Sequence, residues 1–276
     1  MIKQIIKRNF KLIILFNIIV LNCYGSNVTE NYENFSDAKQ ISIHQPMDND
    51  EYYKIIGNLY LETNETEVIN IQTHPAQWPS SDDLNFLRYY LPTNTTLKSL
   101  TLNNCDLTHT DANYIWDALR HNFNCSLETL DLSHNELCHQ DINEPYSDLG
   151  ASFGPAMQTT ETLRKLYLDD INLGSWHISS VAAAFSVNTS TSILSLKSNK
   201  IEDFGAMQLS KMLTLNQSLE TLDLSYNNIT KYGLKELIFG LKSNTNLKEL
   251  ILTGNRFTKS DIVVLGVAGK NKIIKF

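Results

Sequence analysis

The densest group of side chains able to bind a metal lies between Leu137 and Leu149. It contains one imidazole and three carboxylates: His139, Asp141, Glu144 and Asp148. These groups are ligands of zinc and calcium. Their spacing, however, matches neither two zinc ligands one helical turn apart nor the glycine-containing calcium loop. We therefore interpret the segment as an acidic surface loop and expect no metal and no cofactor.

Patterns that would indicate catalysis have little support. The phosphate-binding pattern G-x-x-x-x-G-K-[ST] is absent from the sequence. A nucleophile turn of the form G-x-S-x-G is likewise not expected. Serine, histidine and aspartate are scattered along the chain, and nothing in their spacing supports a catalytic triad. We expect a protein that is not an enzyme. The alternative is an enzyme whose site lies in the insertion at 138–148.

The stretch from Leu219 to Asn246 has a form that recurs along the chain. Its first half follows L-x-x-L-x-L-x-x-N-x-L, with Ile229 as the last apolar residue, and alternates apolar and polar residues as a short strand does. Its second half places Gly233, Leu237 and Leu241 on one face of an amphipathic helix. One such unit cannot bury its own apolar face, so it must stack on neighbours.

Six copies of the first half share one register. They begin at Leu97, Leu127, Leu163, Thr191, Leu219 and Leu247; the last three steps are equal, and the step after Leu127 is the longest. The position after each strand holds Cys105, Asn135, Ile171, Asn199, Asn227 and Asn255. An asparagine there can bond backbone groups of adjacent turns that stacking would leave unpaired. Ile171 offers no amide, so its repeat is predicted to be the least regular.

These repeats resemble leucine-rich repeats of the ribonuclease-inhibitor-like subclass, which are about 28 residues long. The resemblance implies an α/β fold, a horseshoe-shaped solenoid with a parallel concave β-sheet and convex α-helices. We expect this domain to span residues 65–276, with about seven repeats including degenerate caps. Residues 273–276 are predicted to begin another strand, either as a minimal cap or as the start of a longer array.

The amino-terminal residues 1–25 have the layout of a secretory signal peptide. Basic residues precede the apolar run Leu12 to Leu21, and the small residue Gly25 ends the segment. The run is too short to favour a spanning helix of about 20 residues, so we expect a secreted or extracytoplasmic protein with no stable membrane insertion. A lipid anchor on Cys23 is the alternative. Residues 26–64 are polar and are predicted as a leader or linker.

Charge and cysteine content restrict the partners. The net charge is −7, and loss of residues 1–25 with their four basic side chains would make it −11. This excess argues against a nucleic-acid partner, whose phosphates need Lys and Arg, and favours a basic one. Cys105, Cys125 and Cys138 leave several pairings open. Sequons, including those at Asn94, Asn188 and Asn216, would accept glycans in a secreted eukaryotic chain.

The face of the sheet away from the helices is the predicted binding surface, because side chains between the strand leucines point there. Aromatic and acidic residues on it suit a protein partner. The predicted contact residues are Asp131, His134, Tyr167, Asp169, Asp223 and Tyr226. An insertion in one repeat, Cys138 to Asp148, is the alternative surface, since such insertions map to one face of an array.

We therefore expect a secreted, monomeric, non-catalytic module that binds a protein. In an intracellular bacterium it would be an effector, and in a eukaryote an extracellular recognition protein. The alternative is a regulator of an enzyme such as a small GTPase, because one protein with this type of repeat activates such an enzyme. Repeat resemblance alone does not transfer that activity.

Overall fold

The computed structural model describes residues 40–43, 68–72, 91, 94–121, 126–138, 149, 151–264 and 273–276, all of which belong to one compact unit. The predicted signal peptide, the Cys23 anchor, most of the predicted leader and the acidic segment 139–148 lie outside the described residues. The domain boundaries at residues 25 and 64 stay predictions. In the described part, no helix is long and apolar enough to cross a membrane.

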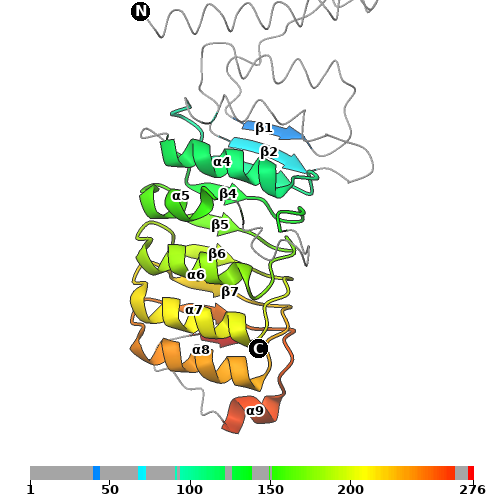
Figure 1. Cartoon of the computed structure of the whole chain (residues 1–276), viewed down its shortest axis with the longest axis vertical. Helices are drawn as coiled ribbons and strands as arrows, with labels where there is room; N and C mark the ends of the chain where they lie inside the picture. Colours follow the sequence, from blue (N-terminus) through cyan, green and yellow to red (C-terminus); the bar gives the residue numbers. More distant parts are fainter. Residues whose placement is uncertain are drawn as a thin grey trace, which may run out of the picture. The chain divides into compact units, whose positions relative to one another are not determined.

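Within the described residues, nine parallel strands form one sheet whose spatial order follows the chain (Figure 1). They are β1 (Gln40–Ile43), β2 (Val68–Gln72), β3 (Ser99–Asn103), β4 (Thr129–Asp131), β5 (Lys165–Tyr167), β6 (Ile193–Ser195), β7 (Thr221–Asp223), β8 (Glu249–Ile251) and β9 (Ile273–Lys275). The predicted α/β solenoid with a parallel sheet is therefore confirmed. Strand β1 falls within residues 26–64, which were predicted as a polar leader. A strand of 4 residues is too short to show an alternation of apolar and polar residues, so the sequence did not reveal it.

Helices follow most of the strands and cover one face of the sheet (Figure 1). They are α4 (His109–His121), α5 (Phe153–Thr159), α6 (His177–Val187), α7 (Asp203–Leu215), α8 (Lys231–Ser243) and α9 (Lys259–Val264). Neighbouring strands lie about 4.8 Å apart, whereas packed helices lie about 8–10 Å apart. A stack of such units therefore bends with its strands on the inner side.

The core lies between the sheet and the helices. Each strand from β3 to β8 sends at least one leucine into it. The parallel register places one leucine from each strand side by side: Leu100, Leu130, Leu166, Leu194, Leu222 and Leu250. All six are buried. On the helix side, Gly233, Leu237 and Leu241 are buried as their spacing predicts. Burial of a side chain of this size stabilises a fold by about 1.5–3 kcal/mol. The leucine row therefore sets the strand register.

The predicted asparagine ladder is present. The Asn199 amide donates to the carbonyl oxygens of Leu168 and Leu196 at 2.8 and 3.0 Å, and its Oδ1 accepts from the backbone of Ile171 and Leu173. Asn135, Asn227 and Asn255 make equivalent bonds to the repeat before them. Each asparagine therefore ties its own repeat to the preceding one.

The ladder is interrupted at Ile171, as its side chain predicts. Ile171 is fully buried, and it has no amide to tie its repeat back to the Leu127 repeat. In its place, the Cys138 N–H donates to the Ile171 carbonyl oxygen at 3.2 Å. The interruption adjoins the insertion that begins at Cys138, where the step between repeats is longest.

A second asparagine ladder runs along the carboxyl ends of the helices. The Asn216 amide donates to the carbonyl oxygens of Phe185 and Asn188 at 2.7 and 3.1 Å, and its Oδ1 accepts from the Leu219 N–H at 2.8 Å. Asn188 and Asn244 bond in the same manner. Asn188 and Asn216 are sequon residues with 3% and 1% of their surface exposed, so a glycan on either amide is incompatible with this fold.

Candidate functional site

Three predicted contact residues lie along one row on the open face of the sheet. The register aligns Asp131 on β4 with Tyr167 on β5, Tyr167 with Ser195 on β6, and Ser195 with Asp223 on β7. Each of these positions lies next to buried leucines along its strand, so its side chain projects to the face away from the helices.

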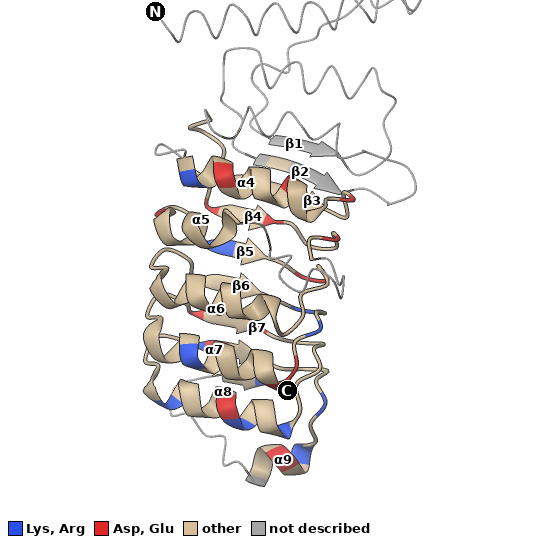
Figure 2. Ribbon diagram, in the orientation of Figure 1, with Lys and Arg blue, Asp and Glu red and all other residues tan. Residues whose placement is uncertain are grey.

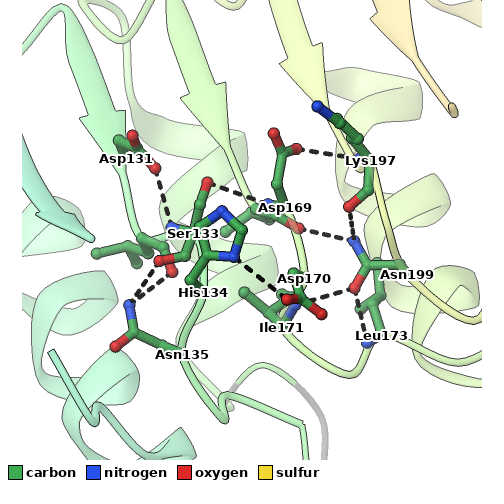
Figure 3. Close-up of polar contacts among 12 residues, drawn as sticks. Asp131, Ser133, His134, Asn135, Asp169, Asp170, Ile171, Leu173, Lys197 and Asn199 are labelled. Atoms are coloured by element: carbon green, nitrogen blue, oxygen red, sulfur yellow. Dashed lines mark hydrogen bonds and ion pairs between the residues drawn. The ribbon is translucent and has the colours of Figure 1, made fainter. Parts of the chain in front are cut away.

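Asp169, two residues beyond Tyr167, completes the group. Its Oδ1 accepts a 2.5 Å hydrogen bond from the Ser195 hydroxyl. The same oxygen accepts a 3.0 Å bond from the Lys197 backbone N–H (Figure 3). Both donors belong to the next repeat, so this carboxylate joins two repeats and is held in one orientation. We call Asp131, Tyr167, Asp169, Ser195 and Asp223 the acidic sheet cluster.

The other two acids are fixed by their own strand ends. An oxygen of Asp131 accepts from the Ser133 N–H at 2.9 Å, and an oxygen of Asp223 accepts from the Ser225 N–H at 2.8 Å. Side chains that are already ordered lose little conformational entropy on binding. The acidic sheet cluster therefore presents preorganised carboxylates.

Burial and mutual repulsion raise the pKa values of two groups in this cluster. Burial raises the pKa of Asp169 above 3.8; hydrogen bonds from Ser195 and Lys197 oppose the shift, and the negative charges of Asp223 and Asp131 add to it. The pKa of Tyr167 is also raised, by burial first and then by Asp131 and Asp169. An added positive charge would favour the ionised forms and oppose both shifts.

The remaining two predicted residues, His134 and Tyr226, lie at the turns that follow the strands. Both have positive φ, as do the residues at the same position in the neighbouring repeats: Asn104, Asp170, Ser198 and Gly254. His134 Nδ1 lies 3.2 Å from an oxygen of Asp170. The Tyr226 ring lies beside Gly254, where a Cβ would come within 2.6 Å of it, and 5.6 Å from Lys197 Nζ.

The six predicted residues therefore form two sets. Asp131, Tyr167, Asp169 and Asp223 are close enough for their charges to interact, whereas His134 and Tyr226 lie at separate turns three repeats apart. Ser195 and Lys197 were not among the six predicted contact residues, although the repeat register already placed both on the same surface. Ser195 stands at the strand position of Asp131, Tyr167 and Asp223, and Lys197 stands at the position of Asp169.

A cavity of about 450 Å³ lies beside the His134 turn. Its lining is polar and acidic: Asn103, Asn104, Asp106, His134, Asn135, Glu136, Asp170 and Asn172. Among the described residues, no three histidine, cysteine or acidic side chains are placed to hold a metal ion. The metal-ligand types at His139, Asp141, Glu144 and Asp148 lie outside those residues.

The nucleophile pattern G-x-S-x-G was expected to be absent, but it occurs at Gly150-Ala151-Ser152-Phe153-Gly154. Ser152 is buried at the start of α5, and its hydroxyl donates to Asp117 Oδ1 at 3.3 Å. His121 also contacts Asp117 Oδ1, at 3.4 Å. In a triad the histidine lies between serine and aspartate; here the aspartate does, so the geometry does not support a nucleophile.

Comparisons with known proteins agree with the repeat assignment. The family profile described as "Leucine Rich repeat" matches residues 123–137, 215–237 and 243–266. No curated protein matches the sequence.

Among solved structures, one described as "Leiomodin-1 Actin-Binding Site 2 (ABS2)" is similar at 16% sequence identity and a TM-score of 0.40. The similarity covers 68% of this chain and 88% of that one. A similarity at this level identifies no partner.

The three profile matches overlap the repeats led by Leu127, Leu219 and Leu247, whose strands pair in register and whose asparagines form the ladder. The chain therefore contains leucine-rich repeats, folded as an α/β leucine-rich-repeat solenoid.

Proposed function

We propose that this chain is a non-catalytic interaction module whose acidic sheet cluster binds a protein that presents basic side chains. The observation that carries the proposal is the row of three hydrogen-bonded carboxylates, Asp131, Asp169 and Asp223, on the open face of the sheet. In the described residues, the Lys197 ammonium lies over the Tyr226 ring, and Lys165, two residues before Tyr167 on β5, is not among the charges that shift the pKa of Tyr167 or Asp169. A lysine or arginine from a partner would supply the missing positive charge.

The shape of the surface supports a protein partner. Four adjacent strands carry the cluster, which at about 4.8 Å between strands spans roughly 15 Å. Tyr167 lies within it, and buried tyrosines with ordered charges are common anchors of protein interfaces. Binding would strengthen as pH rises through the raised pKa of Asp169, because only the carboxylate attracts a cation.

Three finer expectations belong to the same proposal. The equal steps of the last repeats and the full helices α7 and α8 support the ribonuclease-inhibitor-like subclass. Secretion would follow from cleavage near Gly25, which amino-terminal sequencing of the exported product tests. Light scattering of the purified chain tests whether it is a monomer.

The direct test is capture of partners on the immobilised full chain, identified by mass spectrometry and repeated with Asp131→Asn/Asp223→Asn. We expect retention of a basic protein to fall at least about tenfold in the variant, because each lost charge pair contributes about 1 kcal/mol or more. Asp117→Asn/Glu236→Gln, on the helices, is the matched control and should retain the partner. Equal loss in both variants would reject the sheet face as the site.

A second variant, Tyr167→Ala/Tyr226→Ala, distinguishes the two sets of predicted residues. Both tyrosines are at least partly exposed, so the melting temperature should change little while binding weakens. Separate single variants then report whether the Tyr226 turn belongs to the interface. Unchanged affinity in the double variant would move the contact to the insertion or to the helices.

A further inference from the structure

Three aromatic residues occupy one repeat position along the edge where strands lead into helices. Trp176, Phe204 and Tyr232 recur at the same interval in three successive repeats and stand at the starts of α6, α7 and α8. Their exposed fractions are 72%, 41% and 66%. Apolar side chains at neighbouring positions, such as Ile178, Ala206 and Leu234, are buried in the core. The rings are therefore not needed to fill the solenoid.

The rings form an exposed aromatic row. The centroids of Trp176 and Phe204 lie 5.2 Å apart, with their planes inclined at 45°. Lys231 Nζ lies 5.3 Å from the Tyr232 ring centroid. Exposed aromatic residues that repeat over three consecutive units mark an interaction surface more strongly than isolated apolar side chains do. We call Trp176, Phe204 and Tyr232 the aromatic edge.

Basic side chains border the aromatic edge. The backbone of Lys200 pairs with Gly174, two residues before Trp176, and that of Arg256 pairs with Thr230, two residues before Tyr232. Lys231 begins α8 and Lys259 begins α9, and all four basic residues are exposed. Figure 2 shows this basic part of the strand-to-helix edge between α6 and α9, in contrast with the acidic part near β3 to β5.

The nearby acids are turned toward backbone donors. Asp203 accepts from the Thr230 N–H at 2.8 Å, from its hydroxyl at 2.6 Å and from the Gly233 N–H at 3.0 Å. Asp261 accepts from the Thr258 N–H at 2.8 Å. Glu202 is the remaining exposed acid of this segment. The four basic side chains outnumber these three acids, so the edge carries a small net positive charge, although the whole chain is negative.

We propose that the aromatic edge docks on the surface of an anionic lipid membrane, with the rings among the headgroups and the four basic side chains against lipid phosphates and carboxylates. Tryptophan and tyrosine favour the membrane–water interface, where an apolar ring and a polar tip are both accommodated. Juxtaposed lysine and arginine add attraction to anionic lipids. The edge projects rings outward, and a headgroup layer accepts such rings without a matching pocket, whereas a peptide ligand needs one.

This docking surface is distinct from the acidic sheet cluster, which lies on the open face of the sheet. Docking by the edge would leave that cluster accessible, and the repulsion between acidic residues and anionic lipid would orient the solenoid with its basic edge toward the membrane. The proposal involves contact with headgroups and no spanning segment.

The test is sedimentation of the full chain with vesicles of phosphatidylcholine and phosphatidylserine in a two-to-one ratio, against vesicles of phosphatidylcholine alone. We expect binding to the anionic vesicles, weakened by salt. Trp176→Ala/Tyr232→Ala should weaken it at least about tenfold, since each ring loses its burial. Lys231→Glu/Arg256→Glu should weaken it by at least about fivefold for each basic charge removed.

The matched control is Leu215→Ala/Phe239→Ala, which removes exposed apolar side chains elsewhere on α7 and α8. Because the predicted signal segment is present in every variant, its contribution cancels. Circular dichroism confirms that each variant is folded. No binding by the unaltered chain, or equal binding by the aromatic variant, overturns the proposal. Edge-dependent binding of an acidic peptide or single-stranded oligonucleotide without vesicle binding would also overturn it.

Discussion

The repeats led by Leu97, Leu127 and Leu163 differ from those led by Thr191, Leu219 and Leu247. The second group advances in equal steps, and its asparagines are all present. The first group has longer steps, a cysteine and an isoleucine in the ladder, and the polar cavity. Residues 94–172 carry twelve acidic and four basic side chains, whereas residues 173–264 carry seven and nine.

The two groups of repeats therefore share one architecture but differ in what they contribute to the molecule. In the regular group, identical spacing lets each ladder amide find a partner in the preceding repeat. In the irregular group, part of this hydrogen bonding is missing at Ile171 and next to the insertion, where the acidic turn and the cavity lie. The acidic sheet cluster spans the boundary, because Asp131, Tyr167 and Asp169 belong to the first group and Asp223 to the second. We therefore infer that the regular repeats support a surface displayed largely by the irregular ones.

The largest expected loss of stability comes from a substitution in the shared core of the regular group. Leu222→Asp would place an unpaired charge between two neighbouring leucines, and we expect a loss of about 4 kcal/mol or more in the free energy of unfolding. Thr221→Ser, at the adjacent half-buried position on the open face, should be near neutral. Chemical denaturation measures both. An unchanged midpoint for Leu222→Asp would show that the repeat register is wrong.

The next largest loss of stability is expected from a substitution in the asparagine ladder that follows the strands. Asn227→Ala would leave the Ile201 N–H and the Leu196 carbonyl without their side-chain partner, and we expect a loss of about 2–4 kcal/mol. Asn228→Ala, one residue along and only partly buried, is the matched control. If both substitutions cost the same, the amide bonds do not account for the stability of the regular group.

Amide hydrogen exchange sharpens the comparison between the two groups. The Leu107 and Leu173 N–H groups donate to a ladder asparagine, whereas Leu137 faces the Ile171 repeat, which has no such amide. We expect Leu137 to exchange about 5–30 times faster than those two residues, since one bond of this type contributes about 1–2 kcal/mol. Equal protection at all three would mean that the interruption has no local effect.

The smallest effect concerns the pH dependence of stability. The pKa of Asp169 is raised in the folded chain, so folding binds a proton and the ionised carboxylate destabilises the fold as pH rises above about 3.8. Asp169→Asn can keep both accepted bonds on its Oδ1 and removes the charge. Its melting temperature relative to the unaltered chain should therefore rise from low pH to neutral pH. A difference that falls with rising pH would reverse the assigned sign.

The sequence was sufficient for the repeat register, because one leucine row and one asparagine row impose it at a fixed spacing. Strand β1 was not predicted, because Gln40–Ile43 is short and follows a polar stretch. The second ladder was missed because Asn188 and Asn216 were read as sequons, and a local motif does not show burial.

The candidate site was only partly predictable. Alternation along the strands placed Asp131, Tyr167 and Asp223 on one face. The bond from Ser195 to Asp169 depends on contact between repeats, which no single-strand pattern contains. Likewise, the regular recurrence of Trp176, Phe204 and Tyr232 was visible in the sequence, but their exposure was not, because a helix start can face either the core or water.

Carboxyl footprinting tests the central claim most directly. A carbodiimide and an amine label accessible carboxylates, and mass spectrometry compares the labelling of the full chain with and without its captured basic partner. We predict strong protection of Asp131, Asp169 and Asp223 and unchanged labelling of Asp117 and Glu236 on the helices. Protection of Asp117 and Glu236 with unchanged labelling of the three cluster acids would contradict binding through the sheet face.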